Sequence, residues 1–461
     1  MSRQKDRREV LKATIAVAAS RLLGFPLALA ISMWLTRVLP RDEFTFFGVL
    51  ATFSIVFAIF AQAGFQTGVV RMLGEADAGD ERHPAPAVVY AAVASTVICS
   101  LLLAGLFYFA GRGFLPDIPG QTDWLFALAA LLLVVRAVNT VAAEALRGIG
   151  RVGLSSNFSG QGNQGGMVRC LLVLAGFAVA AALDILTLET AIWASIAASV
   201  VCALWALAIV LRHTGAKASP RAIATTIRER RHDNFNMVLS EGLIFWTSGS
   251  AALVIGGILI DATLMAGMVA AFQLRNILTS PLTVIAGAVP NILIRLHREG
   301  EKDELERVMR TTGSAAFLLC VGVCGALALV GPAGFRLLFG ADYGDAYFHF
   351  LIMAVGITYF VYCGLSGQAL LLMGDTRVHR RVMTKVLAVT MPAYVALAYF
   401  FGPYGLSVAL AGSMILQKHL LIRAIRQDLD LDTRAYLDPR EYRKAFTMLK
   451  RILAEKTGRK A

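Results

Sequence analysis

Three arginines lie inside long apolar stretches of this chain, a setting in which a charged side chain is costly. They are Arg21, Arg136 and Arg275. If these stretches cross a membrane, each arginine is expected to face a cavity or a partner. The planar guanidinium group donates two parallel hydrogen bonds to phosphate oxygens, so such a cavity would suit an anionic substrate. The alternatives are a salt bridge between helices, for example with Glu144 or Glu241, and snorkelling for Arg21.

Amide side chains lie close to two of these arginines along the chain. Asn139 is one helical turn after Arg136 and would share its face. A separate pair of glutamines near the end of the second apolar stretch, also one turn apart, could hydrogen-bond a sugar or another helix. The predicted substrate-binding residues are therefore Arg21, Arg136, Asn139, Arg275, Gln273, Asn276, Gln62 and Gln66.

Two further ionisable residues lie in apolar stretches. Glu241 is the predicted coupling-ion residue, because a carboxylate within a membrane span can bind Na⁺ or H⁺. The alternatives for Glu241 are partial solvation and an ion pair with an arginine. Arg169 is close to the predicted cytoplasmic edge of its stretch, where snorkelling to the membrane surface is favoured.

The patterns of several other chemistries are missing from the sequence. All six cysteines fall in apolar stretches, and Cys320 and Cys324 have no neighbouring His or carboxylate, so packing is favoured over a metal site. There is no P-loop sequence Gly-x-x-x-x-Gly-Lys-Ser/Thr. The sequence therefore predicts no catalytic residue, no metal and no cofactor.

The composition indicates a membrane protein. Of the 461 residues, 57% are hydrophobic and 16% are charged, whereas a soluble domain has about 25% charged residues. The apolar runs reach the roughly 20 residues that a membrane-spanning helix needs. A net charge of +13 is expected if Lys and Arg collect on the cytoplasmic side of the membrane, so no nucleic-acid partner is predicted.

The apolar stretches predict twelve membrane-spanning helices. They cover residues 14–36, 44–67, 86–109, 123–142, 166–183, 190–211, 236–258, 263–294, 312–331, 347–373, 386–400 and 405–424. The even-numbered gaps between them hold 19 Lys and Arg, and the odd-numbered gaps hold four. Because basic loops stay in the cytoplasm, this bias places both termini and the even-numbered loops there.

The longest and most basic internal loop divides the chain into two halves. An Ala-Leu-x-x-x-Gly pattern at Ala145 and again at Ala369 ends the fourth span of each half and indicates parallel repeats. In the tail, an amphipathic helix predicted from Asp438 would lie on membrane lipids or dock a cytoplasmic partner. The predicted domains are an N-terminal six-helix bundle over 1–215, a basic linker over 216–235, a C-terminal six-helix bundle over 236–424 and a basic tail over 425–461.

Two segments of the chain resemble a family of bacterial transporters. Residues 337–346, Leu-Leu-Phe-Gly-Ala-Asp-Tyr-Gly-Asp-Ala, are similar to the LFG-x-x-Y-x-x-A signature of bacterial polysaccharide flippases. Residues 35–48 and 64–71 resemble the end of the first span, the turn and the second span of that family. The resemblance covers about residues 12–424.

The polysaccharide flippases belong to the multidrug/oligosaccharidyl-lipid/polysaccharide exporter superfamily. The resemblance implies two six-helix bundles around a central cavity with alternating access. It also implies a lipid-linked oligosaccharide substrate, an undecaprenyl-pyrophosphate-linked repeat unit that crosses the bacterial cytoplasmic membrane during cell-surface polysaccharide biosynthesis. Glycosyltransferases and a polymerase of the same pathway would be partners. The related lipid II flippase has cavity arginines in its first span, which makes Arg21 a candidate for the same role.

Two other functions are alternatives to a flippase. A drug/cation antiporter of the same superfamily would prefer an acidic cavity, whereas arginines outnumber carboxylates in these spans. A polysaccharide polymerase or ligase would need acidic or His-bearing outside loops to hold its base and metal. The predicted outside loops are short and have no paired carboxylates, so the sequence favours a flippase without enzyme activity.

Overall fold

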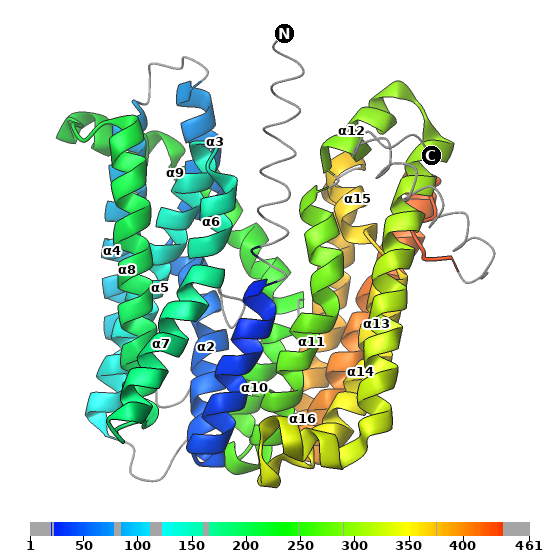
Figure 1. The fold of residues 1–461 in the computed structure, drawn as a ribbon. Coiled ribbons are helices and arrows are strands. Elements are labelled where there is room, and N and C mark those ends of the chain that lie inside the picture. Colours follow the sequence, from blue (N-terminus) through cyan, green and yellow to red (C-terminus); the bar gives the residue numbers. More distant parts are fainter. Residues whose placement is uncertain are drawn as a thin grey trace, which may run out of the picture.

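The computed structural model describes residue 20 and residues 23–77, 84–110, 122–159, 166–247, 249–288, 290–374 and 376–436. These residues are almost wholly helical and form no strand (Figure 1). The predicted all-α membrane fold is confirmed. Arg21 and the amphipathic helix predicted from Asp438 lie outside the described residues.

Two helices of the first half begin at side-chain caps. The Thr122 hydroxyl accepts a hydrogen bond from the Leu125 N–H at the start of α5, and Thr187 forms a capping box with Thr190 at the start of α8. The helices are Leu23–Val38, α2 (Arg41–Ala61), α3 (Phe65–Asp77), α4 (Ala85–Ala110), α5 (Asp123–Gly148), α6 (Val152–Phe158), α7 (Met167–Ala182) and α8 (Leu188–Thr214).

The helices of the second half include two that are interrupted by glycine and proline. In α13 the backbone leaves the helix at Gly331 (φ 68), before Pro332, and in α16 it does so at Gly402 (φ 58), before Pro403. The elements are α9 (Pro220–Thr247), α10 (Ser250–Leu259), α11 (Ala262–Ala288), α12 (Pro290–Glu299), α13 (Lys302–Phe339), η2 (Ala341–Tyr343), α14 (Ala346–Tyr362), α15 (Ser366–Met373) and α16 (Thr376–Asp428).

Seven helices in the described part of the chain are long and apolar enough to cross a membrane, and α9 with α10 makes an eighth if that bent pair is one span. The last two predicted spans correspond to the two parts of α16 on either side of Gly402. Two other predicted spans correspond to the shorter apolar helices Leu23–Val38 and Met167–Ala182. The number twelve therefore stays a prediction.

The predicted basic linker is helical. Residues 220–235 form the first half of α9, which continues into the predicted seventh span. The amphipathic spacing explains this, because Ile223 and Ile227 are one turn apart and pack on the apolar core formed by α3, α4, α5 and α8. The exposed side of this segment carries Arg228 and Arg231.

The helices form two groups in Figure 1, which meet through α2 and α9. In the first group, α5 packs on α4 and α8; in the second, α14 packs on α11, α13 and α16. We call these the N-group (the helix Leu23–Val38 and α2–α8) and the C-group (α10–α16). The α2 helix packs on α10 and α11, and two glycines allow the close approach, Gly48 against Val269 and Gly257 against Val49.

We expect Gly48→Ala to weaken this contact. A methyl group at position 48 would lie 2.4 Å from Val269 Cγ1, and Val269 is a stiff, fully buried side chain. Overpacking of this kind costs ~1–3 kcal/mol, which outweighs the higher helix propensity of alanine. The melting temperature of the purified protein in detergent should therefore fall. Gly322→Ala in α13 is the matched control: nothing lies within 4 Å of its added methyl group, so its melting temperature should hold or rise, and equal behaviour of the two variants would contradict the prediction.

The chain after α16 folds back across the C-group as an extended strap, residues 429–436. Thr433 donates from its hydroxyl to the Cys363 carbonyl, and the Ala435 N–H donates to the Tyr362 carbonyl. Asp432 forms ion pairs with Arg434 and Arg426 at 2.7 and 3.0 Å. The strap therefore covers the break between α14 and α15.

Acid should release this strap. Burial raises the pKa of the Asp432 carboxyl, but hydrogen bonds from Arg434 and Arg426 outweigh it and hold that pKa well below its usual range. Such a carboxyl stabilises the fold above its unfolded pKa, ~3.9 for Asp, and loses this contribution as pH falls toward the folded pKa. Amide exchange in residues 429–436, after correction for intrinsic rates, should thus be slow and constant from pH 7 to about 4 and become faster as the pH falls further.

The Asp432→Asn variant should show the fast exchange already at pH 7. Asp430→Asn is the matched control, because the Asp430 side chain is 89% exposed and pairs only with Lys302 among the described residues. If both variants exchange equally fast, the Asp432 pairs do not hold the strap.

Candidate functional site

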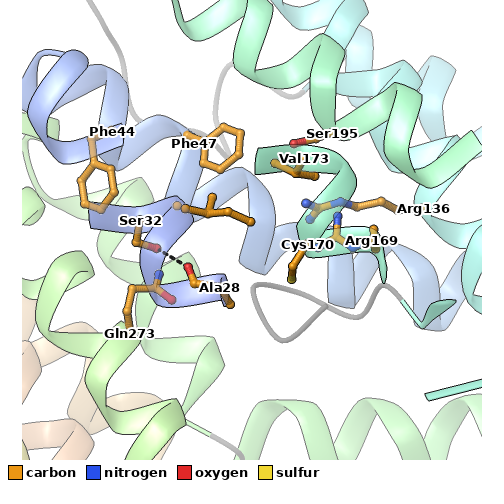
Figure 2. Close-up of a pocket in the computed structure, with 12 residues that line it drawn as sticks. Ala28, Ser32, Phe44, Phe47, Arg136, Arg169, Cys170, Val173, Ser195 and Gln273 are labelled. Atoms are coloured by element: carbon orange, nitrogen blue, oxygen red, sulfur yellow. Dashed lines mark hydrogen bonds between the residues drawn. The ribbon is translucent and has the colours of Figure 1, made fainter. Parts of the chain in front are cut away.

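A small cavity lies where the two groups of helices meet (Figure 2). Its accessible volume is about 20 Å³, room for one or two water molecules. Side chains from the helix Leu23–Val38, α2, α5, α7, α8 and α11 line it. They are Ala28, Ile31, Ser32, Phe44, Phe47, Gly48, Arg136, Arg169, Cys170, Val173, Ser195 and Gln273.

Arg136 reaches this cavity from α5 and is 3% exposed. Its Nη1 donates to Ser54 Oγ at 2.8 Å and to the Ala51 carbonyl at 3.4 Å, both on α2. Its Nε has no hydrogen-bond partner among the described residues, and Arg136 forms no ion pair with any of them. The predicted alternative of a salt bridge with Glu144 is wrong, because Glu144 pairs with Arg147 at 2.9 Å.

Arg169 enters the same cavity from the first turn of α7. Figure 2 shows its guanidinium group beside that of Arg136. Arg169 is 3% exposed, so the predicted snorkelling to the membrane surface is wrong. The physical reason is the packing of α7 on α6 and α8, which turns this face of its first turn toward the inside of the N-group.

The charge balance of the cavity favours an anion. Two guanidinium groups line it, and none of the other ten described lining residues is Asp or Glu. Phe44, Phe47 and Val173 make much of the remaining wall apolar, which lowers the local dielectric constant and strengthens the attraction of the arginines for an anion. A phosphate oxygen would accept hydrogen bonds from the arginines and relieve their mutual repulsion.

The structure places only one of these four predicted amide residues at the cavity. Gln273, from α11 of the C-group, lines the cavity. Asn139 and Gln62 are fully buried elsewhere in the N-group, where their side-chain amides donate to the carbonyls of Phe158 and Ala137. Gln66 lies in the first turn of α3 and is not among the lining residues. The predicted roles of these residues in substrate binding stay predictions.

Arg275 is not brought together with Arg136. Its guanidinium group lies over the Phe272 ring at 4.9 Å, and its Nη1 donates to Asn276 Oδ1 at 3.4 Å. A methyl group built on Gly249 would lie 3.3 Å from Arg275 Nη2, so the side chain reaches the start of α10. Arg275 and Asn276 therefore lie within the C-group, beside the bend between α9 and α10.

Glu241 connects α9 to α3 and is not among the residues that line the cavity. Its Oε1 accepts a hydrogen bond from the Thr67 hydroxyl of α3 at 2.6 Å. It forms no ion pair with a described residue, so the alternative of a pair with an arginine is not seen in this part of the chain. Its Oε2 is buried and has no hydrogen-bond partner among the described residues, and coupling-ion binding at Glu241 stays a prediction.

Known structures resemble this chain over most of its length. Lipid II flippase MurJ in an inward closed conformation matches with a TM-score of 0.68, over 94% of this chain and 90% of that chain, at 10% identity. An inward-facing multidrug resistance MATE family transporter of the MOP superfamily matches with a TM-score of 0.63, over 90% and 98%, at 16% identity. The chain therefore shares its fold with these two proteins.

The chain is also similar to a MOP superfamily transporter from Pyrococcus furiosus. The reverse polarity of the binding pocket of that transporter is described as suggesting a different function for it. It matches with a TM-score of 0.55, over 90% of this chain and 94% of that chain, at 16% identity. No protein-family model matches the chain, and no curated protein sequence matches it significantly. At these identities the likeness to MOP transporters shows the fold alone.

Proposed function

We propose that this protein is a flippase for a lipid-linked saccharide that carries a pyrophosphate group, the undecaprenyl-pyrophosphate-linked repeat unit of a bacterial cell-surface polysaccharide. It would move this substrate across the cytoplasmic membrane by alternating access, with both termini in the cytoplasm. The observation that carries the proposal is the pair Arg136 and Arg169, both 3% exposed, at one cavity without a described carboxylate. The fold shared with a lipid II flippase supports it.

The position of the cavity suits alternating access. Its wall combines α2, α5, α7 and α8 of the N-group with Gln273 of α11. A change in the distance between the two groups would therefore change its volume, and in the present arrangement it admits only water-sized molecules. The pyrophosphate would bind as the groups separate, while the lipid chain stays in the bilayer and the sugars follow the headgroup.

A drug/cation antiporter is the second candidate, because several MATE transporters have this fold. A cationic substrate would need an anionic wall to offset its loss of hydration. The described wall of this cavity has the opposite sign. We therefore rank the flippase first; a polymerase or ligase ranks last, because the similar structures that we report are transporters.

The deciding experiment locates the lipid-linked saccharide in a strain that lacks the protein. A flippase deletion should leave complete repeat units on the cytoplasmic leaflet, where an external glycosidase does not reach them. A polymerase deletion would instead leave single units on the outer leaflet. Unchanged saccharide together with increased sensitivity to cationic drugs would identify an antiporter and reject the proposal.

A further inference from the structure

The end of the molecule away from the basic loops has its own contacts between the two groups. Arg41, the first residue of α2, forms an ion pair with Asp345 at 2.5 Å and donates from Nη1 to the Asp342 carbonyl at 2.9 Å. Arg37 donates to the Leu337 carbonyl at 2.6 Å. All three partners belong to residues 337–346, the segment that carries the sequence signature. This segment is therefore the surface on which the N-group docks.

Close packing surrounds the Arg41–Asp345 pair. The Arg41 guanidinium lies 5.4 Å from the centre of the Tyr343 ring, and the Phe44 ring meets the same ring edge-on at 5.7 Å. The Thr45 hydroxyl, which is fully buried, donates to the Ala262 carbonyl of α11 at 2.7 Å. Separation of the two groups at this end must break these contacts and expose Thr45.

A buried histidine lies one helical turn after Asp345. His349 is 1% exposed, its Nδ1 is 2.9 Å from Ser407 Oγ, and its ring stacks on Tyr404 at 4.3 Å. The Ser407 hydroxyl donates its single hydrogen to the Pro403 carbonyl at 3.0 Å. In this arrangement Ser407 Oγ accepts from His349, which is the tautomer with the hydrogen on Nδ1 and a lone pair on Nε2 that can take a proton.

The charged groups that face His349 are few. Among the residues that the structure describes, they are Asp345 of its own helix and Arg41 of α2. The Tyr404 phenol from α16 stacks on its ring, and Arg336 of α13 lies beside Gly344, just before Asp345. From α11, the uncharged Gly267 lies beside the Asp345 carboxylate.

We propose that the Arg41–Asp345 pair is a latch that holds this end closed, and that a proton bound at Nε2 of His349 releases it. The imidazolium would attract the Asp345 carboxylate one turn away and repel Arg41, so it competes for the ion pair. Protonation would thereby favour the conformation in which the groups separate at this end. The latch does not depend on which substrate the protein carries.

The test measures how fast a thiol reagent reaches position 45. Thr45→Cys is nearly isosteric and buried by the closed latch, and Thr263→Cys, exposed in the first turn of α11, is the reference. Rates are measured in nanodiscs, where reagent reaches both sides. Each Thr45→Cys rate is divided by the Thr263→Cys rate at the same pH, which removes the pH dependence of thiol chemistry. The protein without either substitution gives the background of the native cysteines.

Asp345→Asn and Arg41→Gln should each raise the normalised rate about tenfold at pH 7.5, because a partly buried charged pair is lost. The swapped variant Arg41→Asp with Asp345→Arg should restore the low rate, which separates the latch from misfolding. Lowering the pH to 5.5 should raise the rate at least about threefold with His349 present and leave it unchanged in His349→Gln. A low rate in Asp345→Asn, or a full pH response in His349→Gln, overturns the proposal.

Discussion

Replacing Arg136 or Arg169 by Gln is expected to abolish most transport of a pyrophosphate-linked lipid, and Arg136→Gln should do so without lowering the stability of the substrate-free protein. Each arginine would supply charge-assisted hydrogen bonds to the pyrophosphate, worth ~1.5–3 kcal/mol each, so each substitution should reduce transport by about 10- to 100-fold. The two guanidinium groups are buried side by side without a described carboxylate in the cavity wall. Removal of the Arg136 guanidinium therefore relieves like-charge repulsion and desolvation, and the melting temperature of Arg136→Gln should hold or rise.

A loss of transport without a loss of stability distinguishes a residue that binds substrate from one that only supports the fold. The measurements are flipping of the lipid-linked saccharide in vesicles and the melting temperature with and without inorganic pyrophosphate. Pyrophosphate should stabilise the unsubstituted protein and have little effect on either variant. Arg147→Gln is the matched control, because Arg147 lies on the same helix and is paired with Glu144. Normal flipping and a lowered melting temperature in Arg136→Gln would contradict the prediction.

Arg136→Lys sharpens the same experiment. It keeps the positive charge but loses the planar fork that binds two phosphate oxygens. We expect a flipping rate between those of the unsubstituted protein and Arg136→Gln. If Lys restores the full rate, only the net charge matters, and the bidentate geometry that favours a phosphate group is not used.

Arg275→Gln is expected to lower the maximal transport rate about tenfold while leaving the half-saturating substrate concentration unchanged. Arg275 is not among the lining residues; it lies over Phe272 and reaches the start of α10 beside Gly249. In this position it supports the bend between α9 and α10, which is a local structure that can change during alternating access.

The same kinetics would detect a direct role of Arg275 in substrate binding. If the half-saturating concentration rises and the maximal rate holds, Arg275 contacts the substrate, as its place in an apolar stretch first suggested. Arg298→Gln is the control, because Arg298 is exposed in the last turn of α12 and lies outside both sites. Both variants should elute as folded protein before their kinetics are compared.

The sequence pattern predicted the elements more successfully than the contacts. Apolar runs give α4, α5 and α8 within a few residues, because hydropathy is a property of each segment alone. The linker over 216–235 was expected as a loop and is helical, since Ile223 and Ile227 bury one side of α9 on the N-group. Its many charges hid this amphipathic spacing, which a helical-wheel reading of the linker could have found.

The candidate site was predicted only in part. Arg136 and Gln273 were expected to bind substrate, and both line the cavity. Arg169 was missed, because its short distance from the predicted membrane edge favoured snorkelling. The direction of its side chain depends on the rotation of α7 about its own axis, and that rotation is set by packing on α6 and α8.

Hydropathy and the positions of the charged residues along the chain are enough to predict an all-α membrane protein with cationic groups in its apolar stretches, because hydropathy and the cost of a buried charge belong to single residues and short segments. The tertiary structure alone decided which charges meet. It pairs Arg136 with Arg169 at one cavity, keeps Arg275 apart from them, and joins Arg41 to Asp345 across 304 residues. Such pairs depend on how helices rotate and approach one another, and no local pattern of residues encodes that.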